Sequence, residues 1–349
     1  MLDQSFSAQN YEIIFNLANR RGQIKLADMP VGYQTLVQNI KELKKQRADI
    51  EKKKRADWSK EDSSQREEII NIIHKKIQQK QEYLCNYITE LSRKTNTTDF
   101  RFQLVKHLDH DTGKDVFQIK DDSTHIAFFA IKQLQHNIQK TFKVQQSNRH
   151  AILSNIKVLL NTNLPIYIIR TDISKFYESI PQQKLFEYIN DNTLLSPRSI
   201  SYIKGLINEF NIATSQNIAM GKGIPRGVAI SPLLSEIYMR DIDAQLKNRQ
   251  EVIFYARYVD DIFIILSSLN GETIDQYYNN IRELFNKYSL TLHNASDKCE
   301  LINLFEKNQN TCKVLTYLGY TITIKKTGKN MGSNTKCTKG ITRKIYTTP

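Results

Sequence analysis

Residues 251–268, which read EVIFYARYVDDIFIILSS, decide the fold class of this chain. Two runs rich in β-branched and aromatic residues, VIFYARY and IFIILSS, are separated only by Val259, Asp260 and Asp261. Such runs predict two buried strands, and the short interruption predicts a hairpin with a tight turn. Adjacent carboxylates in this turn repel each other, which costs stability unless a cation neutralises them. An ordinary polar turn does not explain why two acids interrupt so apolar a hairpin.

A third carboxylate follows an earlier strand. The stretch LPIYIIRTDI, residues 164–173, reads as a buried strand that runs into Asp172. When this strand lies beside the hairpin, Asp172 joins Asp260 and Asp261 at neighbouring strand ends. Oxygen ligands of this kind select Mg²⁺, or Mn²⁺, held partly by substrate phosphates. Two such ions about 3.5–4 Å apart activate an attacking 3′-oxygen and stabilise a leaving pyrophosphate.

Further motifs accompany the acidic stretches in a defined order. They are Ser147–Ile152 (SNRHAI), Asp172–Tyr177 (DISKFY), Gly223–Gly227 (GIPRG), Ile230–Leu234 (ISPLL), Tyr258–Asp261 (YVDD), Leu292–Lys298 (LHNASDK) and Tyr317–Ile324 (YLGYTITI). In ISPLL, Ser231 is expected to cap a helix that starts at Pro232. Together these motifs resemble the fingers and palm of the reverse transcriptases, over residues 100–325.

The resemblance implies an α+β right-hand polymerase whose palm is an antiparallel sheet backed by helices. It divides the chain into a helical N-terminal extension (1–95), fingers (96–165), a palm with the active site and a primer-grip hairpin (166–325), and a polar C-terminal tail (326–349). Within the fingers, residues 116–119 and 125–130 read as short strands. The extension reads as a helical hairpin, because a basic helix at 41–55 precedes apolar residues spaced seven apart from Ile70 to Leu91. The tail lacks apolar periodicity, which predicts a reduced or missing thumb.

The same resemblance implies roles for individual residues. Asp172 and Asp260 would bind the two metal ions, with Asp261 as a third carboxylate. The backbone carbonyl of Ile173 would add a ligand. Tyr177 matches the aromatic residue beneath the incoming sugar, where a bulky ring leaves no room for a 2′-hydroxyl and favours deoxynucleotides.

Other residues are placed around the substrate by their motifs. Lys298 matches the lysine proposed as proton donor to pyrophosphate. Arg149, Arg226 and Gly227 match substrate-binding positions, although Arg226 replaces the glutamine usual in retroviral and intron enzymes. Its charged fork is expected to contact triphosphate or template differently, which puts ordinary templated copying in question. The primer grip corresponds to Leu318, Gly319 and Tyr320.

The composition is that of a protein with a polyanionic partner. Its 349 residues include 50 Lys and Arg against 36 Asp and Glu, a net charge of +14. This makes nucleic acid the first partner to test, with solubility as the alternative reading. No apolar run reaches the roughly 20 residues of a membrane span, and the N-terminus is not a signal peptide. Four scattered cysteines favour the cytoplasm, and His107 with His110 lacks a third metal ligand.

The sequence therefore predicts an RNA-directed DNA polymerase that adds dNTPs to a 3′-hydroxyl. Its size, helical extension and IPRG variant resemble the bacterial retron, abortive-infection and defence-associated enzymes, which implies antiphage defence with a dedicated noncoding RNA as template. Template-independent or protein-primed DNA synthesis is the alternative, and an inactive RNA-binding scaffold is a further one. Processivity is expected to be poor unless a partner, an RNA or the extension substitutes for the thumb. The expected protein partners are another protein or a second copy of the chain.

Overall fold

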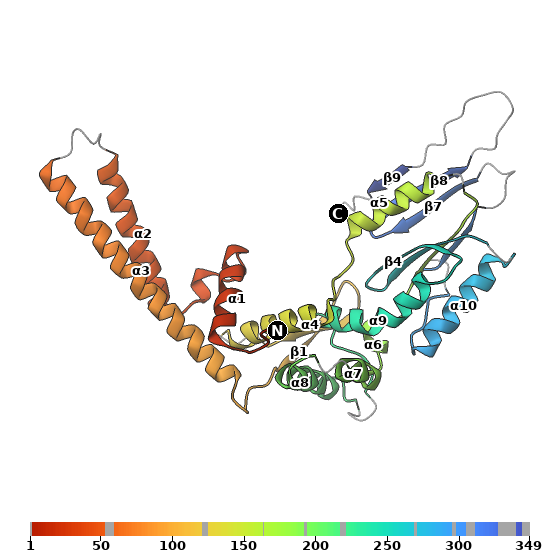
Figure 1. Cartoon of the computed structure of the whole chain (residues 1–349), viewed down its shortest axis with the longest axis horizontal. Coiled ribbons are helices and arrows are strands. Elements are labelled where there is room, and N and C mark those ends of the chain that lie inside the picture. The colour runs from red at the N-terminus through yellow and green to blue at the C-terminus, as the bar shows by residue number, and fades with distance from the viewer. Residues whose placement is uncertain are drawn as a thin grey trace, which may run out of the picture. The chain divides into compact units, whose positions relative to one another are not determined.

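The computed structural model describes residues 2–52, 59–120, 125–162, 164–191, 194–216, 221–268, 271–294, 298–304, 311–326 and 340–343. The helices are α1 (Ala8–Arg20), α2 (Val31–Glu51), α3 (Lys60–Thr95), α4 (Ile126–Phe142), α5 (Arg149–Leu160), α6 (Phe176–Ser179), α7 (Gln182–Asp191), α8 (Pro197–Ala213), α9 (Ser231–Lys247) and α10 (Ile274–Lys287) (Figure 1). The strands are β1 (Leu104–Asp109), β2 (Lys114–Ile119), β3 (Tyr167–Asp172), β4 (Val252–Tyr258), β5 (Asp261–Leu266), β6 (Glu300–Asn303), β7 (Thr311–Tyr317), β8 (Tyr320–Lys326) and β9 (Gly340–Arg343).

The chain forms two compact units. The first comprises Met1–Val105, Ile119–Asn137 and Pro197–Leu206, and the second comprises Lys106–Gln118, Ile138–Ser196 and Ile207–Pro349. Helices α1 to α3 belong to the first unit, and the central sheet belongs to the second. Among the described helices, none combines the length and the apolar composition that a membrane span requires.

An antiparallel sheet with the strand order β4-β5-β3-β6 forms the centre of the second unit. β3 pairs with β5 on one side and with β6 on the other, and Ile168 and Ile169 in its middle are fully buried. Helix α9 contacts β4, and α10 contacts β6. These contacts confirm the predicted antiparallel sheet backed by helices. The first half of β3 is apolar because both faces of the strand are covered there.

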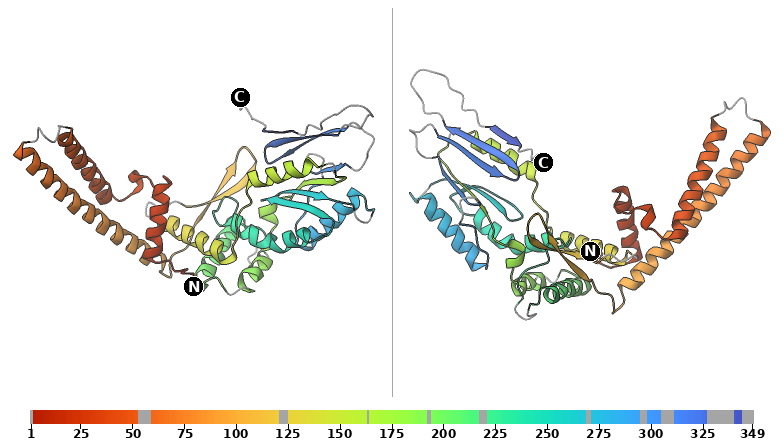
Figure 2. Two further views of the ribbon diagram at one scale, coloured as in Figure 1. Left: turned by 45° about the horizontal axis from the view of Figure 1, so that its top comes forward. Right: turned by 180° about the vertical axis from the view of Figure 1, so that it is seen from behind.

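A hydrophobic core joins α5 and hairpin β7–β8 to this sheet. Its buried side chains include Ile156 of α5, Phe263 of β5, Tyr317 of β7 and Ile322 of β8. The rings of Phe263 and Tyr317 lie 5.1 Å apart between centroids. Both views of Figure 2 show the small sheet β7–β8–β9, in blue, beside α5. The core therefore fixes the predicted YLGY hairpin, which is confirmed, against β5.

The first unit contains the predicted helical hairpin. Helices α2 and α3 lie along each other (Figure 1). Ser59 caps α3, and its side chain and that of Asp62 each accept a hydrogen bond from the other residue's backbone N–H. Leu91 of the predicted apolar stripe is buried on α3, and Ile70, Ile77 and Leu84 are half-buried. The hairpin is therefore confirmed as an element of the chain.

Two segments differ from what the sequence predicts. Residues 125–130 (HIAFFA) read as a strand, but they lead into helix α4, because Ala130, Leu134 and Ile138 continue the apolar run at helical spacing and are buried. The predicted polar tail contributes β9, which pairs with β8. The rest of that tail, on which the expectation of a reduced thumb depends, lies outside the described residues.

Candidate active site

The turn between β4 and β5 brings Asp260 and Asp261 to the end of the central sheet. Tyr258 and Asp261 pair across the two strands, so the turn consists of Val259 and Asp260 alone. Val259 has a φ of +59°. A β-branched residue rarely adopts this left-handed conformation, which costs about 1–3 kcal/mol. The predicted hairpin is confirmed, and the surrounding structure must hold its turn in place.

A buried arginine beneath the turn holds it. Arg257 is 5% exposed, and its Nη1 donates to the Val259 carbonyl at 2.8 Å. Its Nη2 lies 2.6 Å from Glu236 and 2.8 Å from Asp243, both on α9. The Tyr255 hydroxyl donates to Asp243 at 2.7 Å. Because its members are partnered, this charged network is tolerated in the interior, and it ties α9 to the turn.

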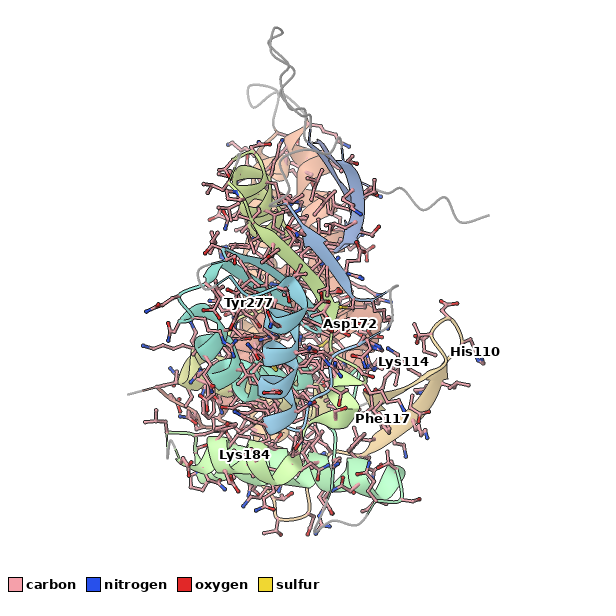
Figure 3. All side chains as sticks on the ribbon, turned by 90° about the vertical axis from the view of Figure 1, so that its right-hand side faces the viewer. His110, Lys114, Phe117, Asp172, Lys184 and Tyr277 are labelled. Atoms are coloured by element: carbon pink, nitrogen blue, oxygen red, sulfur yellow. The ribbon has the colours of Figure 1, made fainter. Side chains whose placement is uncertain are left out.

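Asp172 lies at the end of β3, directly opposite Asp261 of β5. Its backbone carbonyl accepts a hydrogen bond from the His293 N–H at 3.0 Å, and the Ile173 N–H donates to the Asp260 carbonyl at 3.1 Å. Figure 3 labels Asp172 where its strand ends. The structure therefore brings the three predicted acids and Ile173 together at adjacent strand ends.

Burial and mutual repulsion alter the acidity of these carboxyls. Burial, and next the charge of Asp172, raise the pKa of Asp260. Burial, followed by the charges of Asp260 and Asp172, raises the pKa of Asp261 to about 6. Among the described residues, none forms a hydrogen bond with the buried Oδ1 of Asp172. The clustered carboxylate oxygens, one of them buried without a hydrogen-bond partner among the described residues, fit a divalent cation. This is the kind of ion that the three acids were predicted to bind.

Two basic side chains lie among the carboxylates. The Nζ of Lys298 lies 3.2 Å from Oδ2 of Asp172. Arg170 lies 4.0 Å from both Asp261 and Glu300. Within the described ranges, no three His, Cys, Asp or Glu side chains are already arranged around one metal position. This arrangement is compatible with Mg²⁺, which usually takes one or two carboxylates together with water and substrate phosphates.

Tyr177 lies in α6, directly after the strand of Asp172, and its side chain is buried. Its carbonyl accepts a hydrogen bond from the Ile224 N–H at 2.8 Å, which pairs the GIPRG loop with this segment. The guanidinium of Arg226 lies 5.0 Å from the centroid of the Tyr177 ring. Arg226 also donates two hydrogen bonds to Glu178, at 3.1 Å from Nε and 3.3 Å from Nη2. Burial raises the pKa of Tyr177, so its hydroxyl stays neutral.

Two glycines allow the GIPRG loop to approach its neighbours. Gly223 has a φ of +87°, and a Cβ there would lie 3.0 Å from the Glu178 backbone. Gly227 has a φ of +93°, and a Cβ there would lie 2.7 Å from the Phe117 carbonyl oxygen. The Phe117 N–H donates to the Arg226 carbonyl at 2.7 Å. The loop is therefore fixed between α6 and β2, whose residues Lys114 and Phe117 are labelled in Figure 3.

The start of α9 differs in detail from the sequence prediction. Ser231 is the first residue of the helix rather than its cap, which is Ile230. The Ser231 hydroxyl instead donates to the Pro225 carbonyl at 2.6 Å. Pro232 stands in the first turn, where its missing N–H removes no helical hydrogen bond. Ser231 thus attaches the GIPRG loop to α9.

A cavity of about 470 Å³ opens beside the acids. Its lining includes Arg149, Tyr258, Asp260, Asp261, Leu318 and Gly319. The guanidinium of Arg149, at the start of α5, lies 4.4 Å from the centroid of the Tyr258 ring. Leu318 and Gly319 form a two-residue turn with φ values of +51° and +80°, whereas Tyr320 lies at the start of β8 and does not line this cavity. One cavity therefore joins the predicted fingers arginine, the acids and the hairpin turn.

Several contacts at the site were not predicted. Arg257 and Arg170 both interrupt apolar strand sequences, and that interruption is the signal that could have marked them. Lys114 lies close enough to Asp260 to lower its pKa in opposition to burial. His107 lies in strand β1 and His110 just after it, and neither belongs to a metal-binding group within the described chain.

No curated protein matches this sequence. Among solved structures, telomerase from Candida tropicalis in complex with a TWJ fragment of telomeric RNA aligns with a TM-score of 0.44 and 13% identity, over 84% of this chain and 57% of that chain. The apo C. tropicalis telomerase truncated from its C-terminal domain aligns with a TM-score of 0.45 and 13% identity, over 70% and 55%. Telomerase from Candida albicans aligns with a TM-score of 0.36 and 16% identity, over 60% and 38%. The chain thus spans between 38% and 57% of these telomerase chains.

The sequence itself matches one protein family over most of its length. Residues 92–322 match the family described as reverse transcriptase (RNA-dependent DNA polymerase). The matched segment contains β3 and the β4–β5 turn, which carry the three acids, and the GIPRG loop beside them. Because the match covers well over half of the chain, the chain belongs to the reverse transcriptase family.

Proposed function

We propose that this chain is an RNA-directed DNA polymerase that adds deoxynucleotides to a 3′-hydroxyl, with two Mg²⁺ ions at Asp172, Asp260 and Asp261. The carboxylate cluster is the observation that carries the proposal. Two of these acids have a raised pKa, and the third has a buried oxygen without a partner among the described residues. Such a cluster destabilises a metal-free fold, so a scaffold gains nothing from keeping it.

The bound ions would activate the attacking 3′-oxygen and stabilise the leaving pyrophosphate, with Mn²⁺ as the alternative metal. Asp172 and Asp260 would hold them, with Asp261 as a third carboxylate and the Ile173 carbonyl as a further ligand. Lys298, 3.2 Å from Asp172, is placed to give a proton to the pyrophosphate.

We assign the selection of the nucleotide and the binding of the primer to residues that surround the three acids. The Tyr177 ring is packed and neutral, which suits it to exclude a 2′-hydroxyl. Gly227 lets the backbone of its loop pass close to β2. Arg149 and the Leu318–Gly319 turn line the cavity that we assign to the end of the primer, with Tyr320 supporting that turn from β8.

The finer assignment concerns biological context. The IPRG variant and helices α1–α3 support the bacterial retron, abortive-infection and defence-associated class, acting in the cytoplasm in antiphage defence on a dedicated noncoding RNA. In this assignment residues 1–95 bind RNA or a partner, residues 96–165 are the fingers and residues 166–325 the palm. Template-independent or protein-primed synthesis is the second candidate, favoured by the ion pair of Arg226 with Glu178 at a position where retroviral and intron enzymes usually carry a glutamine.

The test uses purified protein with its co-purified nucleic acid left in place. Mg²⁺ and labelled dNTPs are added, with and without RNase, and the products are analysed before and after protease. RNase-sensitive DNA supports the primary proposal, whereas RNase-resistant DNA linked to protein supports the second candidate. Asp260→Asn with Asp261→Asn should abolish incorporation, and the exposed Asp111→Asn should not. Absence of incorporation by the wild type with any nucleotide would contradict both candidates.

A further inference from the structure

We propose that Glu178 determines the sugar selectivity of this site by holding Arg226 against the ring of Tyr177. The inference rests on the proposed function, in which Tyr177 contacts the incoming sugar. Glu178 itself is a positioning residue, since it acts through Arg226 and not on the nucleotide. Neither the sequence motifs nor the resemblance to reverse transcriptases assigns it this role.

The geometry of the ion pair is the first observation. Arg226 donates from Nε to one oxygen of Glu178 at 3.1 Å and from Nη2 to the other at 3.3 Å. A two-point contact of this kind fixes the orientation of the guanidinium plane as well as its position. The same guanidinium lies 5.0 Å from the Tyr177 ring centroid, within the range of a cation–π contact.

The Tyr177 side chain is buried, and its hydroxyl forms a hydrogen bond with the Ser235 side chain, while two neighbours contact the ring itself with a defined geometry. The Phe176 ring lies 5.5 Å away between centroids, at an interplanar angle of 46°. Arg226 supplies the other contact. Steric rejection of a 2′-hydroxyl requires a ring that cannot move aside. Removing the arginine contact would leave the ring with one neighbour fewer on the side of the GIPRG loop, so that the ring would shift more easily away from a 2′-hydroxyl.

The backbone that carries the pair is held firmly. The Ile224 N–H donates to the Tyr177 carbonyl at 2.8 Å, and the Gly223 N–H donates to the Ile180 carbonyl at 2.8 Å. The buried Gln182 donates to the Gly223 carbonyl at 2.9 Å. The backbone of α6 and the backbone of the GIPRG loop are therefore fixed relative to each other. The ion pair with Glu178 then determines the position of the Arg226 side chain.

The carboxylate of Glu178 is unfavourable beside the proposed substrate, because that substrate carries a negatively charged triphosphate. An unneutralised Glu178 would repel that anion, so its charge must serve another group. Without Glu178, Arg226 would be drawn toward the nucleotide phosphates or the nearby Asp260, whose pKa it already lowers. Glu178 therefore competes for Arg226 and keeps it on the ring.

A purely structural role predicts different behaviour. Glu178 is 41% exposed and Arg226 is 22% exposed, and an ion pair this accessible contributes little to folding. Loss of the pair should therefore leave thermal stability unchanged. A change in nucleotide selectivity without a change in stability separates the two roles.

The experiment compares dATP with ATP as substrates in the full-length protein. In Glu178→Gln, we expect the ratio of kcat/KM for dATP to that for ATP to fall about tenfold, with kcat for dATP and Tm near wild type. Glu187→Gln is the matched control, since Glu187 forms a comparable exposed pair with Lys184 at 3.2 Å, within α7. An unchanged ratio in Glu178→Gln would overturn the proposal.

A double-mutant cycle tests whether Glu178 changes the sugar selectivity through Arg226. Because Glu178 acts through Arg226, adding Glu178→Gln to Arg226→Gln should lower the ratio no further than Arg226→Gln alone. Additive losses would overturn the proposal. Equilibrium binding of dATP and ATP in Mg²⁺ distinguishes its failure from that of the proposed function. If the wild type shows no turnover but binds dATP more tightly than ATP, and Glu178→Gln loses this preference, only the polymerase assignment is contradicted. If the wild type and Glu178→Gln show the same preference in binding, the inference is contradicted.

Discussion

Two tight turns lie at the same cavity but reach their shape by different means. In the β7–β8 turn, Leu318 and Gly319 both have positive φ, and glycine adopts such values without steric cost. In the β4–β5 turn, the positive φ belongs to Val259, a β-branched residue that resists it. Glycine favours the first turn locally at its second position, although Leu318 at its first position also has a positive φ. The second is imposed by buried Arg257, and it is the one that carries the acids.

Removing that buried arginine should have the largest effect. Arg257→Met leaves the partly buried Glu236 and Asp243 without their cation, so we expect the free energy of unfolding to fall by about 3 kcal/mol. DNA synthesis should fall as well, because Val259 loses its hydrogen bond. Chemical denaturation and single-nucleotide incorporation measure the two effects.

A compensated variant separates stability from the geometry of the turn. Adding Glu236→Gln and Asp243→Asn to Arg257→Met removes the unpaired charges, so most of the lost stability should return. Incorporation should stay low, because the Val259 carbonyl still lacks its donor. Recovery of both properties together would mean that the arginine acts on folding alone.

Exchanging glycine and valine between the turns should give effects of opposite sign. Gly319→Val places a β-branched residue at a φ of +80° and should cost about 1–3 kcal/mol, although the space around its Cβ is open. Val259→Gly relieves the same kind of strain and should stabilise the protein by about 1 kcal/mol. Its turn would also be less rigid, so incorporation should decrease. Equal destabilisation by both changes would remove the contrast between the turns.

The smallest expected effect concerns the charge carried by the β4–β5 turn. The folded pKa of Asp261, about 6, lies above its ordinary value of 3.8, so the folded state retains this proton longer than the unfolded state. Without metal, stability should therefore fall as the pH rises from about 4 to above 6. Asp261→Asn should flatten this decline and add about 1 kcal/mol at pH 8, after allowance for solvent screening.

The effect of Mg²⁺ on stability tests the same carboxylates in a second way. Mg²⁺ should stabilise the wild type at pH 8, and it should stabilise Asp261→Asn less, because that variant has one carboxylate fewer to neutralise. Asp111→Asn, on the exposed β1–β2 hairpin, should behave as the wild type in both measurements. Thermal denaturation from pH 4 to pH 8, with and without Mg²⁺, gives all of these values, and an identical pH dependence in Asp261→Asn would contradict the raised pKa.

Patterns within short stretches were sufficient to predict most of the fold around the site. Two apolar runs on either side of Val259, Asp260 and Asp261 predicted the β4–β5 hairpin, because strand propensity and turn chemistry are local properties. The second hairpin was predicted from the resemblance of YLGYTITI to the primer grip of reverse transcriptases. HIAFFA was misread as a strand, since a short apolar run is ambiguous until its spacing continues into the next turns. Ser231 was misread as a cap, because its acceptor, the Pro225 carbonyl, lies in the preceding loop.

The sequence by itself determined that three acids lie where strands end, since strand length and turn position follow from local residue preferences. Only the tertiary structure placed β3 beside β5 and decided which charges surround the acids. Lys298 lies beside Asp172, and Arg170 lies beside Asp261 on the neighbouring strand. Glu178 pairs with Arg226, which lies far from it in the sequence. Partners this distant in sequence meet only when the sheet and the GIPRG loop are assembled. The acidity of the site and the orientation of its arginine are therefore properties of the folded chain, because both depend on distance and burial.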